Sequence, residues 1–220
     1  MAMKVIITGA TGMVGEGVLF ECLANPAVEQ VLMVNRKSYA LTHPKLKECI
    51  IPDFMRLDNF TAQLTGYDAC FFCAGISSIG MKEEEFNHIT YELTMNFATK
   101  LAGLNPTMVF TYVSGANTDS SEQGKVMWAR VKGKTENALM RLPFKKAYNF
   151  RPGGMKATAG QKNLKGWYPV VAILYPVFRA LMPNSVSTLQ EVALAMINCV
   201  SKGYSKQILE VKDIKELAKA

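Results

Sequence analysis

Short apolar runs alternate along the chain with longer segments in which apolar residues recur every three or four positions. The short runs predict buried strands, and the longer segments predict amphipathic helices. The expected strands cover residues 5–8, 31–34, 48–51, 68–73, 108–113, 146–150 and 207–211. Because strands and helices alternate, we expect an α/β fold: a doubly wound parallel sheet with helices on both faces.

The helical segments complete this picture. The first ends at Asn25-Pro26, and others are expected at residues 82–103, 122–141, 168–181 and 189–201 and at the charged C-terminus. The apolar stripe of segment 82–103 consists of Phe86, Ile89, Leu93, Phe97 and Leu101. His88 lies off this stripe with no carboxylate or histidine at ligand spacing, so we assign it no chemistry. We expect one domain over residues 1–220, in which residues 154–205 form a small C-terminal portion on the substrate side.

A glycine-rich turn joins the first strand to the first helix. Gly9, Gly12 and Gly15 follow the apolar strand directly, and the helix begins within the same segment. Gly9 permits a tight reversal, Gly12 leaves room for a pyrophosphate, and Gly15 allows the helix to pack closely on the strand. Gly15 is followed by Glu16 and not by lysine, which excludes a nucleoside triphosphatase loop. The pattern therefore favours a dinucleotide site over an ordinary strand-to-helix turn.

The end of the second strand carries information about the cofactor. NAD-preferring proteins of this architecture place an acidic residue there to bind the ribose, whereas an arginine accommodates a 2′-phosphate. This chain has Asn35, Arg36 and Lys37 at that point. Two cations can bind a dianionic phosphate, so we expect NADP, with NAD as a possible cofactor. A surface Arg-Lys pair without a ligand is the alternative.

Other loops follow strands at the same edge of the sheet, where ligands bind in such folds. Asp53 is expected near the adenine, with a solvated turn aspartate as the alternative interpretation. Ala74-Gly75 lets the backbone turn close to a ligand, and Ser114 ends the fifth strand. Pro152-Gly153 forms a rigid and then permissive exit from the sixth strand.

The net charge and the distribution of basic residues bear on which partners the protein binds. The formal net charge is +7 and the sequence pI is about 9.1, but basic residues are scattered without a basic arm or aromatic-interleaved patch. We therefore expect a solvated basic surface and no nucleic-acid partner. The chain has five cysteines and no secretory signal, which favours a cytoplasmic location. Cys70 and Cys73 are expected on opposite strand faces, as buried hydrophobes and not metal ligands.

The most membrane-like stretch runs from Trp167 to Met182. Pro169, Pro176 and Arg179 interrupt it, and it is shorter than the roughly 20 apolar residues of a membrane span. We expect no membrane span and interpret the stretch as part of a soluble core. An interfacial or dimer-forming segment is the alternative, and a homodimer is possible.

Four motifs together resemble the short-chain dehydrogenase/reductase superfamily, in its atypical and extended, nucleoside-diphosphate-sugar epimerase-like branch. They are residues 8–15 (TGATGMVG), 112–114 (YVS), 131–136 (VKGKTE) and 150–153 (FRPG), and the resemblance covers essentially the whole chain. It implies a Rossmann fold that binds NAD(P). The residues expected to contact the cofactor are Gly9, Thr11, Gly12, Met13, Val14, Gly15, Asn35, Arg36, Lys37, Asp53, Cys73, Ala74, Gly75, Lys132, Pro152 and Gly153.

The resemblance also implies a catalytic Ser, Tyr and Lys, with the Lys four residues after the Tyr. Ser114 and Lys132 match, but Trp128 occupies the tyrosine position. An indole N–H is a donor only and does not titrate in the accessible range, so Trp128 cannot serve as a general acid. The replacements open to the chain are Tyr112, Tyr91, Tyr168 and a water held by Ser114 and Lys132.

Two functions remain open at this point. The first is an NADP-preferring oxidoreductase that moves hydride to or from a small carbonyl, alcohol or sugar-nucleotide substrate. The second is a catalytically impaired, NADP-sensing regulatory or scaffold protein. An intact Ser114 and Lys132 favour the first function, whereas Trp128 favours the second.

Overall fold

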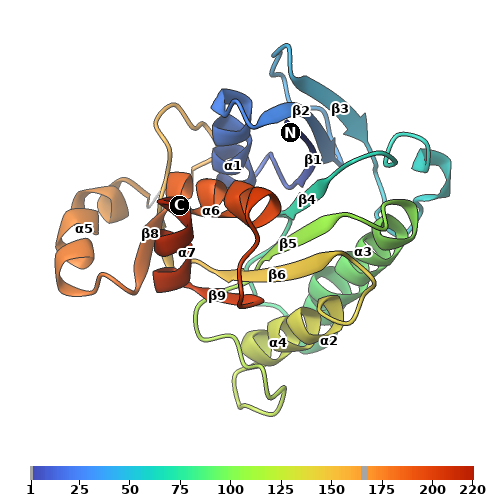
Figure 1. The fold of residues 1–220 in the computed structure, drawn as a ribbon. Helices are drawn as coiled ribbons and strands as arrows, with labels where there is room; N and C mark the ends of the chain where they lie inside the picture. Colours follow the sequence, from blue (N-terminus) through green and yellow to red (C-terminus); the bar gives the residue numbers. More distant parts are fainter. Residues whose placement is uncertain (1, 165–167) are drawn as a thin grey trace.

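The computed structural model describes residues 2–164 and 168–220 and contains a seven-stranded parallel sheet (Figure 1). Its strand order is β3-β2-β1-β4-β5-β6-β9. The strands are β1 (Met3–Thr8), β2 (Val28–Asn35), β3 (Leu46–Ile50), β4 (Ala69–Phe72), β5 (Val109–Val113), β6 (Lys146–Arg151) and β9 (Ile208–Glu210). The order reverses between β1 and β4, and in such sheets ligands bind beyond the carboxyl ends of the strands at this point.

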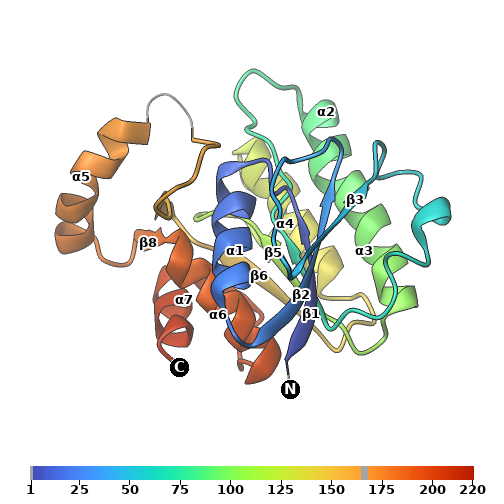
Figure 2. The ribbon, with the colours of Figure 1, turned by 90° about the horizontal axis from the view of Figure 1, so that it is seen from above.

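Helices cover both faces of the sheet, as expected from the sequence (Figure 2). One face carries α1 (Met13–Ala24), α6 (Leu189–Ser201) and α7 (Val211–Ala218). The other face carries α2 (Glu83–Asn87), a π-helical turn at His88–Glu92, α3 (Leu93–Leu104) and α4 (Met127–Leu139). A short 3-10 helix, Asp58–Phe60, follows β3. The doubly wound α/β fold is confirmed.

Alternate residues of the central strands supply two separate cores. Val5 and Ile7 of β1 pack with α1 and α6, whereas Ile6 packs with Phe97 and Leu101 of α3. This follows from the period of two along a strand, which directs neighbouring side chains to opposite faces. Cys70 and Cys73 belong to opposite cores, as predicted, and both thiols are free. Among residues 2–164 and 168–220, no cluster of side chains could hold a metal ion.

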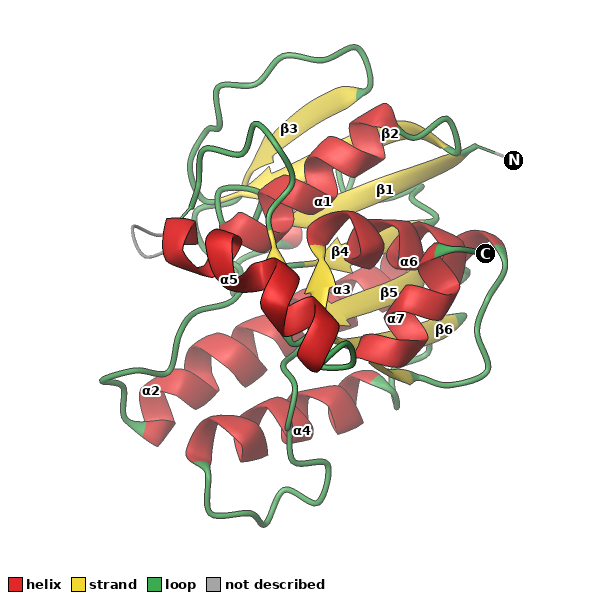
Figure 3. Cartoon of the chain, turned by 90° about the vertical axis from the view of Figure 1, so that its left-hand side faces the viewer, coloured by secondary structure: helices red, strands yellow, loops and turns green. Residues whose placement is uncertain are grey.

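The segment after β6 forms a smaller layer beside α6 and α7 (Figure 3). It contains β7 (Gly154–Lys156), α5 (Tyr168–Leu181) and β8 (Val186–Thr188), and β7 pairs in parallel with β8. The interpretation of α5 as soluble core is wrong: Ile173 and Leu181 are 77% and 76% exposed. Trp167, where that stretch was expected to begin, lies outside the described residues. No helix in the described part of the chain is long and apolar enough to cross a bilayer.

Two helical predictions need correction. The helix expected from residue 122 begins at Met127, because Asp119 accepts backbone hydrogen bonds from Ser121 (3.0 Å) and Gly124 (2.6 Å) and so forms a local turn. In the segment 82–103, a π turn interrupts the helix. Leu93 packs against the core as expected, but Thr90 and Thr94 are also buried, whereas Ile89 is only half-buried.

His88 does have a carboxylate partner, contrary to the sequence interpretation. Its Nδ1 lies 2.7 Å from Oε2 of Glu92, one turn further along. Both side chains are exposed, so this contact is a surface pair of the kind that contributes little to stability.

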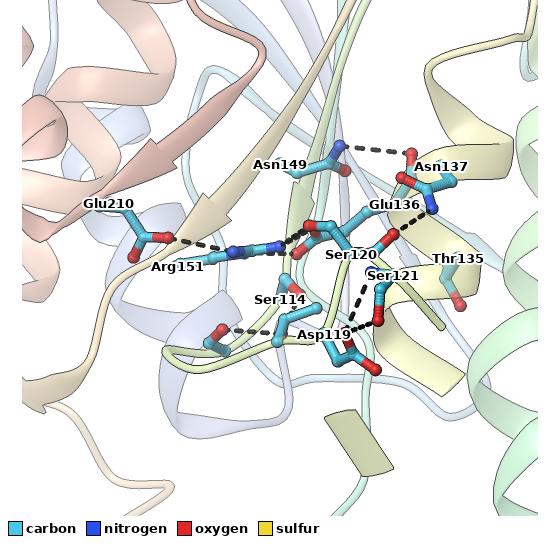
Figure 4. A network of polar contacts seen from close by, with 12 residues as sticks. Ser114, Asp119, Ser120, Ser121, Thr135, Glu136, Asn137, Asn149, Arg151 and Glu210 are labelled. Carbon is cyan, nitrogen blue, oxygen red and sulfur yellow. Dashed lines mark hydrogen bonds and ion pairs between the residues drawn. The ribbon is translucent and has the colours of Figure 1, made fainter. Parts of the chain in front are cut away.

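A buried ion pair joins α4 to the end of β6 (Figure 4). Nε and Nη2 of Arg151 donate to the two carboxylate oxygens of Glu136 at 3.0 and 2.5 Å. Nη2 also donates to Oγ of Ser120 (2.7 Å), and Nη1 donates to Glu210 of β9 (3.1 Å). The Glu136 side chain is fully buried, whereas that of Glu210 is 52% exposed. One guanidinium therefore connects α4, β6, β9 and the loop before α4.

Loss of the buried carboxylate should destabilise the fold. Glu136→Gln removes the buried carboxylate that neutralises Arg151 and leaves only the exposed Glu210, and we expect the free energy of unfolding to fall by about 3 kcal/mol or more. Glu210→Gln, which alters the exposed partner of the same guanidinium, should cost less than about 1 kcal/mol. Urea denaturation of both variants measures the difference. Equal losses in the two variants would contradict this account.

Candidate functional site

The glycine turn lies at the carboxyl end of β1, and its three glycines differ in their surroundings. Gly9 has a positive φ of 70°, and a Cβ there would lie 2.7 Å from Cα of Ala74. A Cβ at Gly15 would lie 2.2 Å from the carbonyl oxygen of Gly9. At Gly12 the only contact within 4 Å would be with that same oxygen, at 3.4 Å. The fold itself thus requires Gly9 and Gly15, whereas Gly12 leaves open space for a ligand.

The first turn of α1 faces this space with free donors. Gly12 caps the helix without a side-chain hydrogen bond, and Thr11 beside it is exposed. The N–H groups of Met13, Val14 and Gly15 have no acceptor among the described residues. Free N–H groups and the positive end of the helix dipole suit an anion. The arrangement fits the pyrophosphate of a dinucleotide.

Glu16, which sequence reasoning did not include in the site, fastens a distant loop to this turn. Its carboxylate accepts hydrogen bonds from the backbone N–H groups of Lys162 (3.0 Å) and Asn163 (2.9 Å) and from the hydroxyl of Tyr39 (2.6 Å). Burial alone would raise the pKa of Glu16, but these hydrogen bonds lower it below its ordinary value. The sequence did offer one signal for this role: Glu16 is an acidic residue that stands among Gly15, Gly17 and Val18, all of which are buried in α1.

The end of β2 presents an unpaired amide. Asn35 is buried, and neither its Oδ1 nor its Nδ2 has a hydrogen-bond partner among the described residues. A buried amide without a partner is costly, and an external polar group would relieve that cost. Arg36 and Lys37, the next two residues, are exposed. Asn35 fits a ribose hydroxyl, and the two cations are free to approach a phosphate beyond it.

The other predicted cofactor contacts lie on neighbouring loops. The N–H of Ala74 donates to Oγ1 of Thr8 at 3.2 Å, Cys73 before it is half-buried, and Gly75 has open space where a Cβ would lie. Asp53 accepts from the N–H of Met55 at 2.8 Å and lies 3.6 Å from Arg56. Its observed partners are thus those of a local turn.

The exit of β6 is built by packing. Gly153 has a positive φ of 66°, and a Cβ there would lie 2.3 Å from the carbonyl oxygen of Ser185. The carbonyl oxygen of Pro152 accepts from Oγ of buried Ser187 at 2.8 Å. These contacts join the end of β6 to β8 and to the residue before it.

Ser114, Trp128 and Lys132 lie around the end of β5. Ser114 is buried, and its Oγ lies 3.0 Å from Oγ1 of Thr118. The indole of Trp128 covers the next residue, since a Cβ at Gly115 would lie 3.4 Å from Cζ3 of the ring. Nζ of Lys132 lies 5.6 Å from the ring centroid of Tyr112, two residues before Ser114. The face of α4 that carries both residues therefore lies against the end of β5.

Burial lowers the pKa of Lys132 to about 8, and the carboxylate of Glu136 opposes part of this shift. Burial and the same carboxylate raise the pKa of Tyr112 far above its ordinary value. Tyr112 therefore keeps its proton, whereas Lys132 can exchange one near neutral pH. Lys132 and Tyr112 are neighbours, but only Lys132 has a pKa that suits a proton donor near neutral pH.

The other two tyrosines considered as replacement proton donors, Tyr91 and Tyr168, make contacts elsewhere. Tyr91 lies on the π turn, with Nζ of Lys134 at 4.1 Å from its ring centroid. Tyr168, at the start of α5, accepts a hydrogen bond from the backbone N–H of Ala157. Neither of these contacts involves Ser114.

Comparison with known proteins adds a family and a fold. The family model described as "NAD dependent epimerase/dehydratase family" matches residues 5–125. Protein HTATIP2 of Rattus norvegicus is 25% identical over 225 residues, which cover 98% of this chain and 89% of that protein. Protein fmp52, mitochondrial, of Emericella nidulans is 26% identical over 167 residues, which cover 73% and 69%.

Solved structures share the fold at low sequence identity. MoeE5 in complex with UDP-glucose and NAD has a TM-score of 0.66 and 13% identity, over 98% of this chain and 80% of that one. Uronate dehydrogenase from Agrobacterium tumefaciens has a TM-score of 0.65 and 17% identity, over 94% and 76%. The Rossmann architecture is thus common to this chain and to these proteins.

The glycines allow binding to be separated from folding. Gly12→Ala should change the free energy of unfolding by less than about 1 kcal/mol and weaken NADPH binding at least tenfold, because the methyl group would enter the open space at the turn. Gly15→Ala should lose about 3 kcal/mol, because its Cβ meets backbone. Urea denaturation and calorimetric titration provide the two readouts. Unchanged affinity in folded Gly12→Ala would contradict this assignment.

Lys132 should make stability depend on pH. In the folded protein it loses its proton near pH 8, whereas in the unfolded chain it keeps it to about pH 10.4. Between these values the unfolded chain binds more protons, so the free energy of unfolding rises with pH. Lys132→Met should remove a rise on the order of 2 kcal/mol, and Lys134→Met should retain it. Urea denaturation from pH 7 to 10 tests this, and an unchanged slope in Lys132→Met would refute it.

Proposed function

The chain belongs to the NAD dependent epimerase/dehydratase family, and from this premise we propose that it is an NADP-preferring oxidoreductase. Its substrate would be a small carbonyl or alcohol, or a sugar nucleotide. The observation that carries the proposal is that Lys132 lies against Tyr112 of β5, two residues before Ser114, at the carboxyl edge of the sheet where the glycine turn also lies.

The proposed cofactor contacts use groups that the protein leaves unsatisfied. The N–H groups of Met13, Val14 and Gly15 would hold the pyrophosphate, and the unpaired amide of Asn35 would bind the ribose. Exposed Arg36 would bind a 2′-phosphate, which distinguishes NADP from NAD. MoeE5, which shares the fold, has a solved structure in complex with UDP-glucose and NAD, and this supports a nicotinamide dinucleotide at this place. Such a cofactor, when bound, accepts or supplies the hydride.

The chain's own residues would position the substrate and move the proton. The hydroxyl of Ser114, beside Thr118, would hold the substrate oxygen. Lys132 would give its ammonium proton to that oxygen in reduction and take it back in oxidation. A general acid works best with a pKa near the operating pH, and the Lys132 pKa of about 8 meets this requirement. Trp128, which cannot titrate, would enclose the site and exclude water.

Trp128 also supports a second candidate, an NADP-sensing binding protein without turnover. In that case the dinucleotide site would report the redox state of the cofactor to a partner. Such a protein must bind NADP and NADPH with different affinities, because a ligand with equal affinity for two states shifts no equilibrium. Calorimetric titration with both forms measures this difference directly.

Arg36→Ala tests the cofactor preference. Loss of a charge-assisted contact costs about 1.5 kcal/mol or more, so we expect NADPH affinity to fall at least tenfold while NADH affinity stays unchanged. Arg141→Ala removes another exposed cation, beyond the last turn of α4, and should have no effect. Equal weakening of NADPH and NADH in Arg36→Ala would contradict the 2′-phosphate assignment.

Ser114→Ala and Lys132→Met test catalysis, with NADPH oxidation measured across a panel of carbonyl compounds and oxidised sugar nucleotides. Both variants should lose at least about 99% of the parent rate, the usual scale of acid–base catalysis. Trp128→Tyr, which restores a phenol at that position, should retain or raise the rate. Intact NADPH binding without turnover in the parent or in Trp128→Tyr would refute the oxidoreductase and leave the sensor.

A further inference from the structure

The outer face of α5 is apolar and exposed. Its side chains recur at positions four apart along two adjacent rows, Ile173, Val177 and Leu181 in one row and Leu174, Phe178 and Met182, just past the helix end, in the other. A helix of 3.6 residues per turn places both rows on one side. All six side chains are among the exposed large apolar residues of the protein. They form one continuous surface, here called the α5 face.

The polar atoms of α5 point the other way. Tyr168 and Tyr175 are buried, and the hydroxyl of Tyr175 accepts a hydrogen bond from Arg179 at 2.8 Å. Arg179 in turn donates to Glu191 of α6 at 2.7 Å. These contacts anchor the inner side of the helix to the domain through tyrosine and arginine, whereas the aliphatic side faces outward. This is the reverse of the usual arrangement for a surface helix.

Exposed lysines lie on the segments that adjoin α5. Of the eight Lys and Arg residues between positions 137 and 190, Arg151 pairs with Glu136 and Glu210, and Arg179 pairs with Glu191 of α6, so these two do not contribute a free charge. Lys156 of β7 is exposed, with its Nζ 5.6 Å from the ring centroid of Tyr175, and Lys162 is exposed on the loop that leads toward α5. An apolar helix face with nearby cations matches an anionic lipid surface, where both interactions add.

We propose that α5 docks the protein on an anionic lipid bilayer, with the α5 face inserted among the acyl chains and the neighbouring lysines at the headgroups. The 14-residue helix would lie in the plane of the interface, since it is too short to span. A second copy of the chain fits less well. A two-fold interface on this surface would bring the exposed lysines beside α5 in one subunit toward those of the other, and these like charges would oppose the contact.

Flotation of the full-length protein with vesicles tests the docking. We expect binding to vesicles of phosphatidylcholine with phosphatidylserine, and at least tenfold weaker binding to phosphatidylcholine alone. Ile173→Ser combined with Leu181→Ser should reduce binding at least tenfold. Both side chains are more than three-quarters exposed, so the variant should fold, and NADPH affinity and circular dichroism check this.

Matched controls distinguish insertion of the α5 face from non-specific hydrophobic adsorption and from purely electrostatic binding. Ile79→Ser removes an apolar side chain that is 90% exposed on the loop before α2, and it should leave binding unchanged. Lys156→Gln with Lys162→Gln should weaken binding to the anionic vesicles only. Absence of binding to either vesicle, or equal binding by the Ile173 and Leu181 double variant, would overturn the proposal. A dimer in light scattering that the double variant abolishes, without vesicle binding, would assign the face to a second copy.

Discussion

A buried ion pair determines how the carboxyl edge of β6 and helix α4 are assembled. Glu136 is fully buried and pairs with Arg151, and this contact fixes one face of α4 against the end of β6. Lys132 lies one helical turn before Glu136, and Trp128 one turn before Lys132, so all three share that face. The positions of the candidate proton donor and of the indole thus depend on a contact that itself performs no chemistry.

The fold was predictable because its signals are local and repeated. Each strand needs a short apolar run, and burial on both faces makes those runs nearly continuous, as at Val31 to Val34. Gly9 and Gly15 could be identified because only glycine fits their backbone contacts. Arg36 and Ser114 could be located because strand ends meet at one edge of a parallel sheet. Predictions of this kind require only the order of elements along the chain.

Features that depend on distant partners were less accessible. Glu16 resembles a solvated first-turn acid until the loop at Lys162 and Asn163 is placed against it. Helix α4 begins later than the sequence predicts, because the side chain of Asp119 accepts backbone hydrogen bonds that would otherwise be available to a helix. The apolar sequence of α5 indicates burial but does not indicate by what, and here the domain buries only its tyrosine side. Long-range geometry decides each of these cases.

Glu16 has a further consequence for the balance of charge at the turn. Its carboxylate lies on the same helical turn that would hold a pyrophosphate, and two like charges so close would repel each other. The donors of Tyr39, Lys162 and Asn163 compensate the charge of Glu16 while the loop stays in place. Detachment of the loop would leave an uncompensated anion beside the phosphates. Loop attachment and dinucleotide binding must therefore favour each other reciprocally, which is a positive thermodynamic coupling.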